Sequence, residues 1–319
     1  MFKHILLPLD GSSLAERVLP HAVALSNAFD AQITLLRVIH KESEDGQSNI
    51  INPMTWQMRK SEAEAYLNSI QNRLAENDID SEIKIAEGNP AQEIVEFARN
   101  EDVGLIILSS HGSSGVSAWN INSTVQKVLL RAFMPVMIIR AYQEEYGQLT
   151  GLMYERLLVP LDGSKRAESI LPLAKSICTT QNSKVFLTHI IEEPVLPRQT
   201  PLREEIQELI NQLYEINLEE ANRYLAEVKT QFQPESVEMV VESSKKPTVT
   251  LHNIIDREKI DLVVLSAHGF SGESRWPYGK IALSFIVYGT TPLIILQDLS
   301  IDDVGTTLAE KFTEQSKGH

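Results

Sequence analysis

The sequence is poor in several features that mark particular classes of protein. It contains one cysteine, Cys178, among 319 residues, so no disulfide can form within the chain. A chain of this kind suits a reducing compartment. No apolar run approaches the roughly 20 residues needed to span a bilayer, and the opening run Lys3–Leu7 is too short for the apolar region of a signal peptide. We therefore expect a cytoplasmic protein with no membrane partner.

Positive charge is also scarce. The chain has 29 Lys and Arg residues against 43 Asp and Glu residues, which gives a net charge of −14. Non-specific binding to nucleic acid requires a positive footprint, so we expect no nucleic-acid partner. The histidines show no spacing typical of a metal site, and cysteines cannot pair, so we also expect no dedicated metal centre.

What the sequence does contain is a duplication. Leu-Pro-Leu-Asp-Gly-Ser at residues 7–12 returns as Val-Pro-Leu-Asp-Gly-Ser at residues 159–164, and Leu-Ser-Ser-His-Gly at residues 108–112 returns as Leu-Ser-Ala-His-Gly at residues 265–269. The same dipeptides at matched places in two halves indicate two copies of one domain. We expect a first domain at 1–141, a linker at 142–152, a second domain at 153–298 and an acidic polar tail at 299–319.

The local patterns predict an α/β fold in each half. Continuous apolar runs such as 33–39, 105–108 and 136–139 are typical of strands buried on both faces. Helical spacing occupies Leu14–Ala28, Asn89-Pro90 is typical of a helix start, and a long helix is expected from about Leu202 to Phe232. Strict alternation of strands and helices predicts a parallel sheet with helices on both faces, and ligands of such sheets bind beyond the carboxyl ends of the strands.

Two aspartates occupy that position after the first strand of each half. Asp10 and Asp162 either cap the following helix or accept hydrogen bonds from the amine or hydroxyl groups of a ligand. The glycine that follows each one provides the turn. Ser12 and Ser164 are natural N-caps for the next helix, and we interpret them as structural.

A second candidate site follows the fourth strand of each half. A glycine-bearing loop runs from Ser109 to Thr124 in the first half and from Ser266 to Ile281 in the second. Free amide groups at the start of a helix favour an anion such as phosphate. The alternative is an ordinary loop between a strand and a helix. His111 and His268 recur within these loops, and we interpret them as residues that order the loop or contact phosphate rather than as catalytic groups.

On these motifs the chain resembles a tandem universal stress protein, over roughly residues 1–141 and 153–298. The nucleotide motif of that family is Gly, two residues, Gly, nine residues, then Gly-Ser or Gly-Thr. Gly112 and Gly269 match the second glycine, whereas Ser109 and Ser266 replace the first. In the first half, Asn122 replaces the third glycine, and Ser123 keeps the hydroxyl residue. In the second half, Gly279 keeps the third glycine, and Lys280 replaces the hydroxyl residue.

The departures from the family motif at Asn122 and Lys280 can be interpreted physically. If the third glycine position needs a positive φ, Asn is the best replacement for glycine. Lys280 either serves phosphate as a point charge or fills the phosphate site itself. Because Ser123 offers a hydroxyl at the helix start, we expect the first domain to bind nucleotide more tightly if one domain does.

The resemblance implies two Rossmann-like domains of the adenine nucleotide α-hydrolase-like kind, each with five parallel strands in the order 3-2-1-4-5. It implies ATP, ADP or AMP, with or without Mg²⁺, at the carboxyl edge of one or both sheets. Asp10 and Asp162 would contact adenosine, and the backbones of Val38 and Ile190 would contact adenine. The full set of expected nucleotide-binding residues is Pro8, Asp10, Val38, Ser109, His111, Gly112, Asn122, Ser123, Thr124, Pro160, Asp162, Ile190, Ser266, His268, Gly269, Gly279, Lys280 and Ile281.

The function implied is a stress-response regulator that signals to an unknown protein partner by conformational state or contact, not an enzyme, with at most slow incidental ATP hydrolysis. The resemblance also implies that the fifth strands, Val136–Arg140 and Leu293–Gln297, pair within one chain as a pseudo-dimer that can form a further homodimer. The alternative is an interaction module or scaffold whose altered motifs have lost nucleotide. An adenylate-forming enzyme is disfavoured, because the chain lacks a Ser-Gly-Gly loop and a His-x-Gly-His signature.

Overall fold

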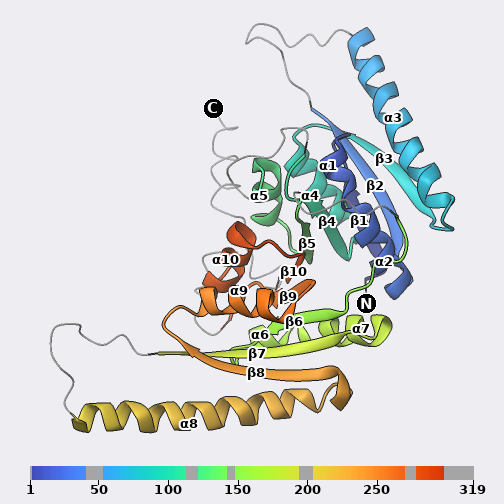
Figure 1. Cartoon of the computed structure of the whole chain (residues 1–319). Helices are drawn as coiled ribbons and strands as arrows, with labels where there is room; N and C mark the ends of the chain where they lie inside the picture. The colour runs from blue at the N-terminus through green and yellow to red at the C-terminus, as the bar shows by residue number, and fades with distance from the viewer. Residues whose placement is uncertain are drawn as a thin grey trace, which may run out of the picture. The chain divides into compact units, whose positions relative to one another are not determined.

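The computed structural model describes residues 2–40, 53–112, 121–141, 148–193, 204–269 and 278–297. They form two compact units, Met1–Leu152 with Gln297 and Met153–Leu296 (Figure 1). Residues 142–147 of the expected linker and the whole expected tail, 299–319, lie outside the described ranges.

Each unit is an α/β fold built on one parallel sheet. The strands of the first unit are β1 (His4–Pro8), β2 (Gln32–Ile39), β3 (Ser81–Glu87), β4 (Leu105–Ser109) and β5 (Val136–Ile139). They lie in the order β3-β2-β1-β4-β5, and each of these neighbouring pairs is parallel. The expected order 3-2-1-4-5 is therefore confirmed in this unit.

The second unit repeats this sheet. Its strands are β6 (Arg156–Pro160), β7 (Lys184–Glu192), β8 (Val237–Ser244), β9 (Leu262–Ser266) and β10 (Leu293–Leu296). Their order is β8-β7-β6-β9-β10, again with parallel pairing. The register is also repeated, because Pro8 pairs with Leu36 in the first unit and Pro160 pairs with Thr188 in the second.

The apolar runs become strands because both faces of each sheet are covered. All five residues of β4 and of β9 are buried, and the three central residues of β1 and of β6 are fully buried. In Figure 1, α3 lies along β2 and β3, and α8 lies along β7 and β8, in agreement with their contacts. Continuous burial explains why these strands show no polar alternation.

The helices connect successive strands. Those of the first unit are α1 (Ser13–Glu16), α2 (Leu19–Phe29), α3 (Pro53–Ala75), α4 (Pro90–Asn100) and α5 (Ser123–Leu129). Those of the second are α6 (Lys165–Glu168), α7 (Leu171–Gln181), α8 (Glu204–Lys229), the short 3₁₀ helix η1 (Pro234–Ser236), α9 (Pro247–Glu258) and α10 (Lys280–Tyr288). The helix start predicted at Asn89-Pro90 is confirmed, because Asn89 Oδ1 accepts hydrogen bonds from the amides of Ala91 and Gln92 at 3.2 and 3.4 Å.

The single helix expected over Leu14–Ala28 is wrong. The segment forms α1 and then α2, with Pro20 in the first turn of α2. Proline has no N–H to donate to the preceding turn and its ring clashes with that turn, so it is tolerated only where a helix begins. Apolar spacing continues across the break, which is why periodicity alone predicts one helix.

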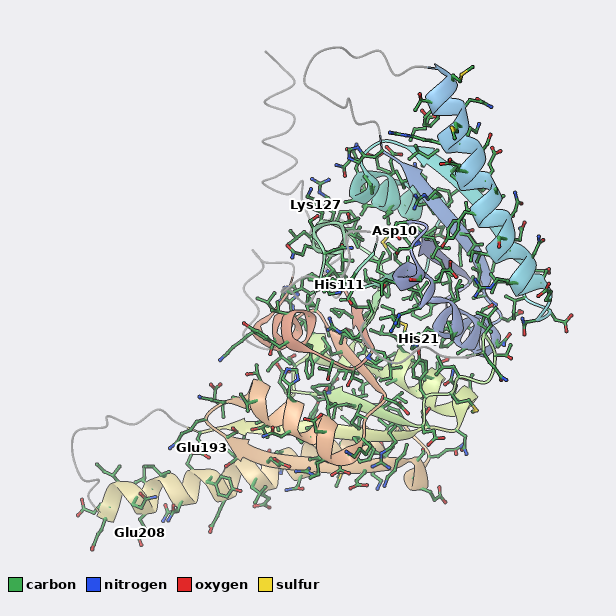
Figure 2. The ribbon with its side chains drawn as sticks, turned by 45° about the horizontal axis from the view of Figure 1, so that its top comes forward. Asp10, His21, His111, Lys127, Glu193 and Glu208 are labelled. Atoms are coloured by element: carbon green, nitrogen blue, oxygen red, sulfur yellow. The ribbon has the colours of Figure 1, made fainter. Side chains whose placement is uncertain are left out.

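His21 is an unusual member of the core of the first unit. This residue of α2 (Figure 2) has a fully buried side chain. The equivalent residue in α7 of the second unit is Leu173, which is also fully buried. Burial lowers the pKa of His21 to about 3. The imidazole is therefore neutral in the folded protein, whereas in the unfolded chain it binds a proton below pH 6.5.

Replacing His21 with leucine should remove part of the acid sensitivity of the protein. Because the folded-state pKa lies below the unfolded value, His21 lowers the free energy of unfolding as pH falls from 6.5 towards 3. We expect His21→Leu to stabilise the protein by at least about 1 kcal/mol more at pH 4 than at pH 7. Urea denaturation at both pH values tests this, and an equal effect at both would contradict it.

Candidate ligand site at the carboxyl edge of each sheet

Asp10 lies two residues after the end of β1, and its carboxylate is held by Ser12. The amide and the hydroxyl of Ser12 both donate to Asp10 Oδ1, at 3.0 and 2.6 Å. Ser12 Oγ in turn accepts from the amide of Ala15 at 3.1 Å and caps α1. Gly11 has φ +84°, a value that favours glycine, so the turn needs this residue.

The second unit repeats this arrangement. The amide of Ser164 donates to Asp162 Oδ1 at 3.0 Å, Ser164 Oγ accepts from Ala167, and Gly163 has φ +81°. The interpretation of both serines as helix caps is confirmed. Since the serines cap the helices, the aspartates are not needed for that task.

The loop after the fourth strand meets this aspartate at a glycine. A Cβ atom built on Gly112 would lie 2.0 Å from Asp10 Oδ2, and one built on Gly269 would lie 2.0 Å from Asp162 Oδ2. No real side chain tolerates such a distance. The two repeated motifs are therefore in contact within each unit, and the glycine is what allows the contact.

The repeated histidines directly precede these glycines in the chain, and their side chains are buried. His111 and His268 are 1% and 3% exposed. His111 Nδ1 lies 3.1 Å from Ser110 Oγ, and that oxygen accepts from the amide of Ala141 at 3.0 Å. Figure 2 shows His111 in the first unit with Asp10. Their burial agrees with a role in ordering the loop.

The expectation of a positive φ at the third glycine position is wrong. Asn122 has φ −79° and Gly279 has φ −72°, both in extended backbone that any residue adopts. Asn122 is the N-cap of α5, and its Oδ1 accepts from the amide of Val125 at 2.8 Å. Gly279 cannot do this, so α10 has no side-chain cap.

Other residues expected to bind nucleotide lie at strand ends and helix starts of the same edge. Ser109 and Ser266 are the buried last residues of β4 and β9. Ser123 and Lys280 are exposed at the first positions of α5 and α10. The half-buried members are Pro8, Thr124, Pro160, Ile190 and Ile281.

A pocket of about 610 Å³ opens beside Asp10 in the first unit. Its walls come from the turn after β1, the end of β2, α3 and the start of α4. Of the expected residues, this pocket brings Asp10 and Val38 together. The lining residues are Asp10, Gly11, Arg37, Val38, Ile39, His40, Arg59, Glu62, Ala63, Tyr66 and Pro90.

Sequence reasoning missed Tyr66 and Arg37. Burial raises the pKa of Tyr66 well above its ordinary value, and the nearby carboxylates of Glu16 and Asp10 raise it further. The phenol therefore stays protonated and keeps a hydrogen to donate. Arg37 Nη1 donates to the carbonyl of Leu9 at 3.2 Å.

Both missed residues have counterparts in the second unit. Burial raises the pKa of Tyr224, and the nearby carboxylates of Glu168 and Asp162 add to this effect. Its ring packs edge-on against His189, which takes the place of Arg37, with 6.2 Å between ring centroids. Burial lowers the pKa of His189, against the opposing effect of Asp162. A repeat of Ala63 and Tyr66 as Ala221 and Tyr224 was the signal that could have revealed the tyrosines.

Comparison with known proteins identifies the family. The model of the universal stress protein family matches residues 1–140 and 153–297. The chain belongs to the universal stress protein family. Its two matched segments make it a tandem member, and no helix among the described ranges is long and apolar enough to cross a membrane.

Curated relatives match one half at a time. Universal stress protein MJ0531 of Methanocaldococcus jannaschii is 25% identical over 150 residues, which cover 46% of this chain and 86% of that protein. Universal stress protein YxiE of Bacillus subtilis is 29% identical over 148 residues, which cover 44% of this chain and all of that protein.

Solved structures with the same fold extend over both halves. A functionally unknown protein from Pseudomonas aeruginosa PAO1 has a TM-score of 0.69 at 14% identity and covers 98% of each chain. A universal stress protein from Archaeoglobus fulgidus has a TM-score of 0.63 at 18% identity and covers 92% of this chain and 96% of its own. At these identities the likeness shows the fold alone.

Gly112→Ala should disrupt the contact between the two motifs. The added methyl group must displace the Asp10 carboxylate, so we expect a loss of about 1–3 kcal/mol in unfolding free energy, typical of overpacking. The loss should be smaller when Asp10→Ala is also present, because the collision partner is then gone. Urea denaturation of the two single variants and the double variant measures this coupling.

Gly279→Ala provides the matched control. A Cβ atom there meets nothing nearer than the carbonyl oxygen of Ala267, at 3.4 Å, and the backbone is extended. We expect this variant to lose less than Gly112→Ala. Additive effects of Gly112→Ala and Asp10→Ala would show that the two residues do not interact.

Proposed function

We propose that the chain is a regulatory protein of the stress response that binds adenine nucleotide at the carboxyl edge of one or both sheets. One observation carries this proposal. The Asp10 carboxylate, fixed by Ser12 and packed against Gly112, lies on the wall of a 610 Å³ pocket that also includes Val38. Pockets of this size suit small ligands, and the carboxyl edge of an open parallel sheet is where such ligands bind.

We expect different residues of the site to bind different parts of the nucleotide. Asp10 Oδ1 is committed to Ser12, and its carboxylate can accept hydrogen bonds from ribose hydroxyls or an amine. Val38 would offer its backbone to adenine. Phosphate would lie at the start of α5, where Asn122 already caps the helix and Ser123 leaves an exposed hydroxyl. In the second unit the uncapped start of α10 and Lys280 would take this role.

We propose a binding protein rather than an enzyme. A general base must reach the reacting proton, and both repeated histidines are buried. The described residues contain no group of three or more His, Cys, Asp or Glu side chains that could hold a metal ion. Any Mg²⁺ would therefore arrive with the nucleotide, and ATP hydrolysis would be slow. The chain would act in the cytoplasm, signalling through its conformational state or by contact with a protein partner.

Isothermal titration calorimetry with ATP and AMP tests the proposal. Asp10→Asn and Asp162→Asn keep the size of each side chain and remove its charge, and we expect each to weaken its own site by about 1.5–3 kcal/mol, the range of a hydrogen bond to a charged group. In the double variant both sites should be weakened by this amount. Asp256→Asn, on the exposed side of α9, changes net charge equally and should have no effect. No heat from the unmodified protein at millimolar nucleotide would refute the proposal.

A second function is favoured by two particular residues. The side chain of Asn122 caps α5, and Lys280 places a cation where phosphate would lie. Both fit a nucleotide-independent interaction module with degenerate sites. Native mass spectrometry of the protein as purified separates the two, because a co-purified adenine nucleotide contradicts the module.

The expected pairing of the fifth strands stays a prediction. We propose that Val136–Arg140 and Leu293–Gln297 join edge to edge within one chain. Such pairing would protect two apolar strand edges from aggregation.

A further inference from the structure

The first half of α8 carries an apolar stripe that its own unit leaves exposed. The four side chains of this α8 stripe are 45% to 70% exposed, and they are Ile206, Leu209, Leu213 and Ile216. The buried residues of the helix, Ala221, Leu225 and Val228, all lie in its second half. Figure 1 shows the start of α8 reaching past the ends of β7 and β8. Apolar side chains gathered on an exposed surface mark a place where another molecule binds.

The α8 stripe continues the wall of the proposed ligand site in the second unit. In the first unit, Glu62 of α3 lines the ligand pocket. The spacing that matches buried Ala63 of α3 to buried Ala221 of α8 also matches Glu62 to Glu220. Ile216 lies about one helical turn before Glu220. A molecule bound to the stripe would therefore lie beside the ligand edge of its unit, which suits a protein that signals by contact.

The spacing of the stripe is that of a seam between paired helices. Its members follow one another at intervals of three, four and three residues. These intervals keep apolar side chains on the line where one helix packs against another. The α8 stripe therefore fits the apolar face of a second helix. Because the seam is short, the charges beside it decide which helix binds.

Carboxylates border the stripe on one side. The residues that directly precede its four members are Glu205, Glu208, Gln212 and Glu215. The three glutamates are exposed, and Figure 2 labels Glu208 on α8. The ion pair that α8 forms, between Arg223 and Glu220, does not include them. Residues 204–222 contain no lysine or arginine, so the border is strongly acidic.

This charge disfavours several occupants of the stripe. A second copy of the chain would bring another acidic helix, and its net charge of −14 would add to the repulsion. The tail at 299–319 is also acidic. An anionic lipid surface would be repelled for the same reason. Lysine or arginine beside the apolar face of a partner helix would instead complement the three glutamates.

We propose that the α8 stripe is a docking surface for a protein partner, and that this partner presents an amphipathic helix with a basic border. The apolar face of the partner helix would pack along the stripe. Its cations would lie opposite Glu205, Glu208 and Glu215. Docking requires no nucleotide, so it holds whether or not either unit binds one.

A designed peptide serves as the probe of this surface. It has about 18 residues, or five helical turns, with Leu at intervals of three and four and Lys beside each Leu. Fluorescence anisotropy of the labelled peptide should give a Kd of about 10 μM or tighter. A peptide with Gln in place of Leu, and another with Glu in place of Lys, should each bind at least about tenfold more weakly. Added salt should weaken binding of the Leu/Lys peptide.

The variant L209Q/L213Q removes the centre of the stripe. Both leucines are exposed and glutamine is a good helix former, so circular dichroism should be unchanged. We expect affinity for the Leu/Lys peptide to fall at least about tenfold, because the apolar contact is lost. The matched control is M54Q/M58Q, which replaces two exposed methionines of α3 and should leave affinity within about twofold.

The variant E205Q/E208Q/E215Q tests the acidic border. Affinity for the Leu/Lys peptide should fall at least about fivefold, and the remaining binding should depend less on salt. The control changes three exposed glutamates of the first unit to glutamine, namely Glu64, Glu76 and Glu101. This control alters the net charge equally and should leave affinity within about twofold.

Several results would overturn the proposal. One is no binding of the Leu/Lys peptide at about 100 μM. Another is an equal loss in the stripe variants and their controls, which would mean general attraction of a basic peptide to an acidic protein. Equal binding of the Leu/Glu peptide would remove the basic border. Sedimentation velocity without peptide covers the remaining case, because a dimer that L209Q/L213Q dissociates would assign the stripe to a second copy of the chain.

Discussion

The candidate site depends on the contact between the carboxylate after the first strand and the glycine after the fourth. Parallel strands end at one edge, and β1 and β4 are neighbours because the strand order reverses between them. Gly112 lets the loop after β4 approach Asp10 to a distance that no other residue allows. Ser12 fixes the carboxylate from the other side. The pocket, the helix start and the buried histidine are all positioned around this contact.

Duplication preserved this contact and changed the charge around it. Asp162, Ser164 and Gly269 repeat the geometry of the first unit, down to the distance at which a Cβ would collide. At the starts of α9 and α10 the second unit has Lys246 and Lys280, where the first unit has Asn89 and Ser123. A fold tolerates this divergence because exposed charges contribute little to stability, whereas they strongly affect which charged ligand approaches.

Much of the fold could be predicted from the pattern of residues. Continuous apolar runs identified strands buried on both faces, and Asn89-Pro90 identified a helix start. Local rules failed where several signals competed. The apolar spacing of Leu14–Ala28 hid the break that Pro20 imposes. At Asn122 the alignment with the glycine of the family motif suggested a left-handed backbone. The residue instead has an extended backbone and caps a helix.

The duplication is visible in the repeated motifs, and the parallel α/β class and the aspartate, serine and glycine of each turn follow from local patterns in the chain. Which distant residues share the site depends on tertiary packing. Arg37, Arg59 and Tyr66, from β2 and α3, line the same pocket as Asp10, so their roles depend on how the strands and helices pack. The same holds for the contact of Gly112 with Asp10, because sequence spacing does not measure the distance between two strand ends.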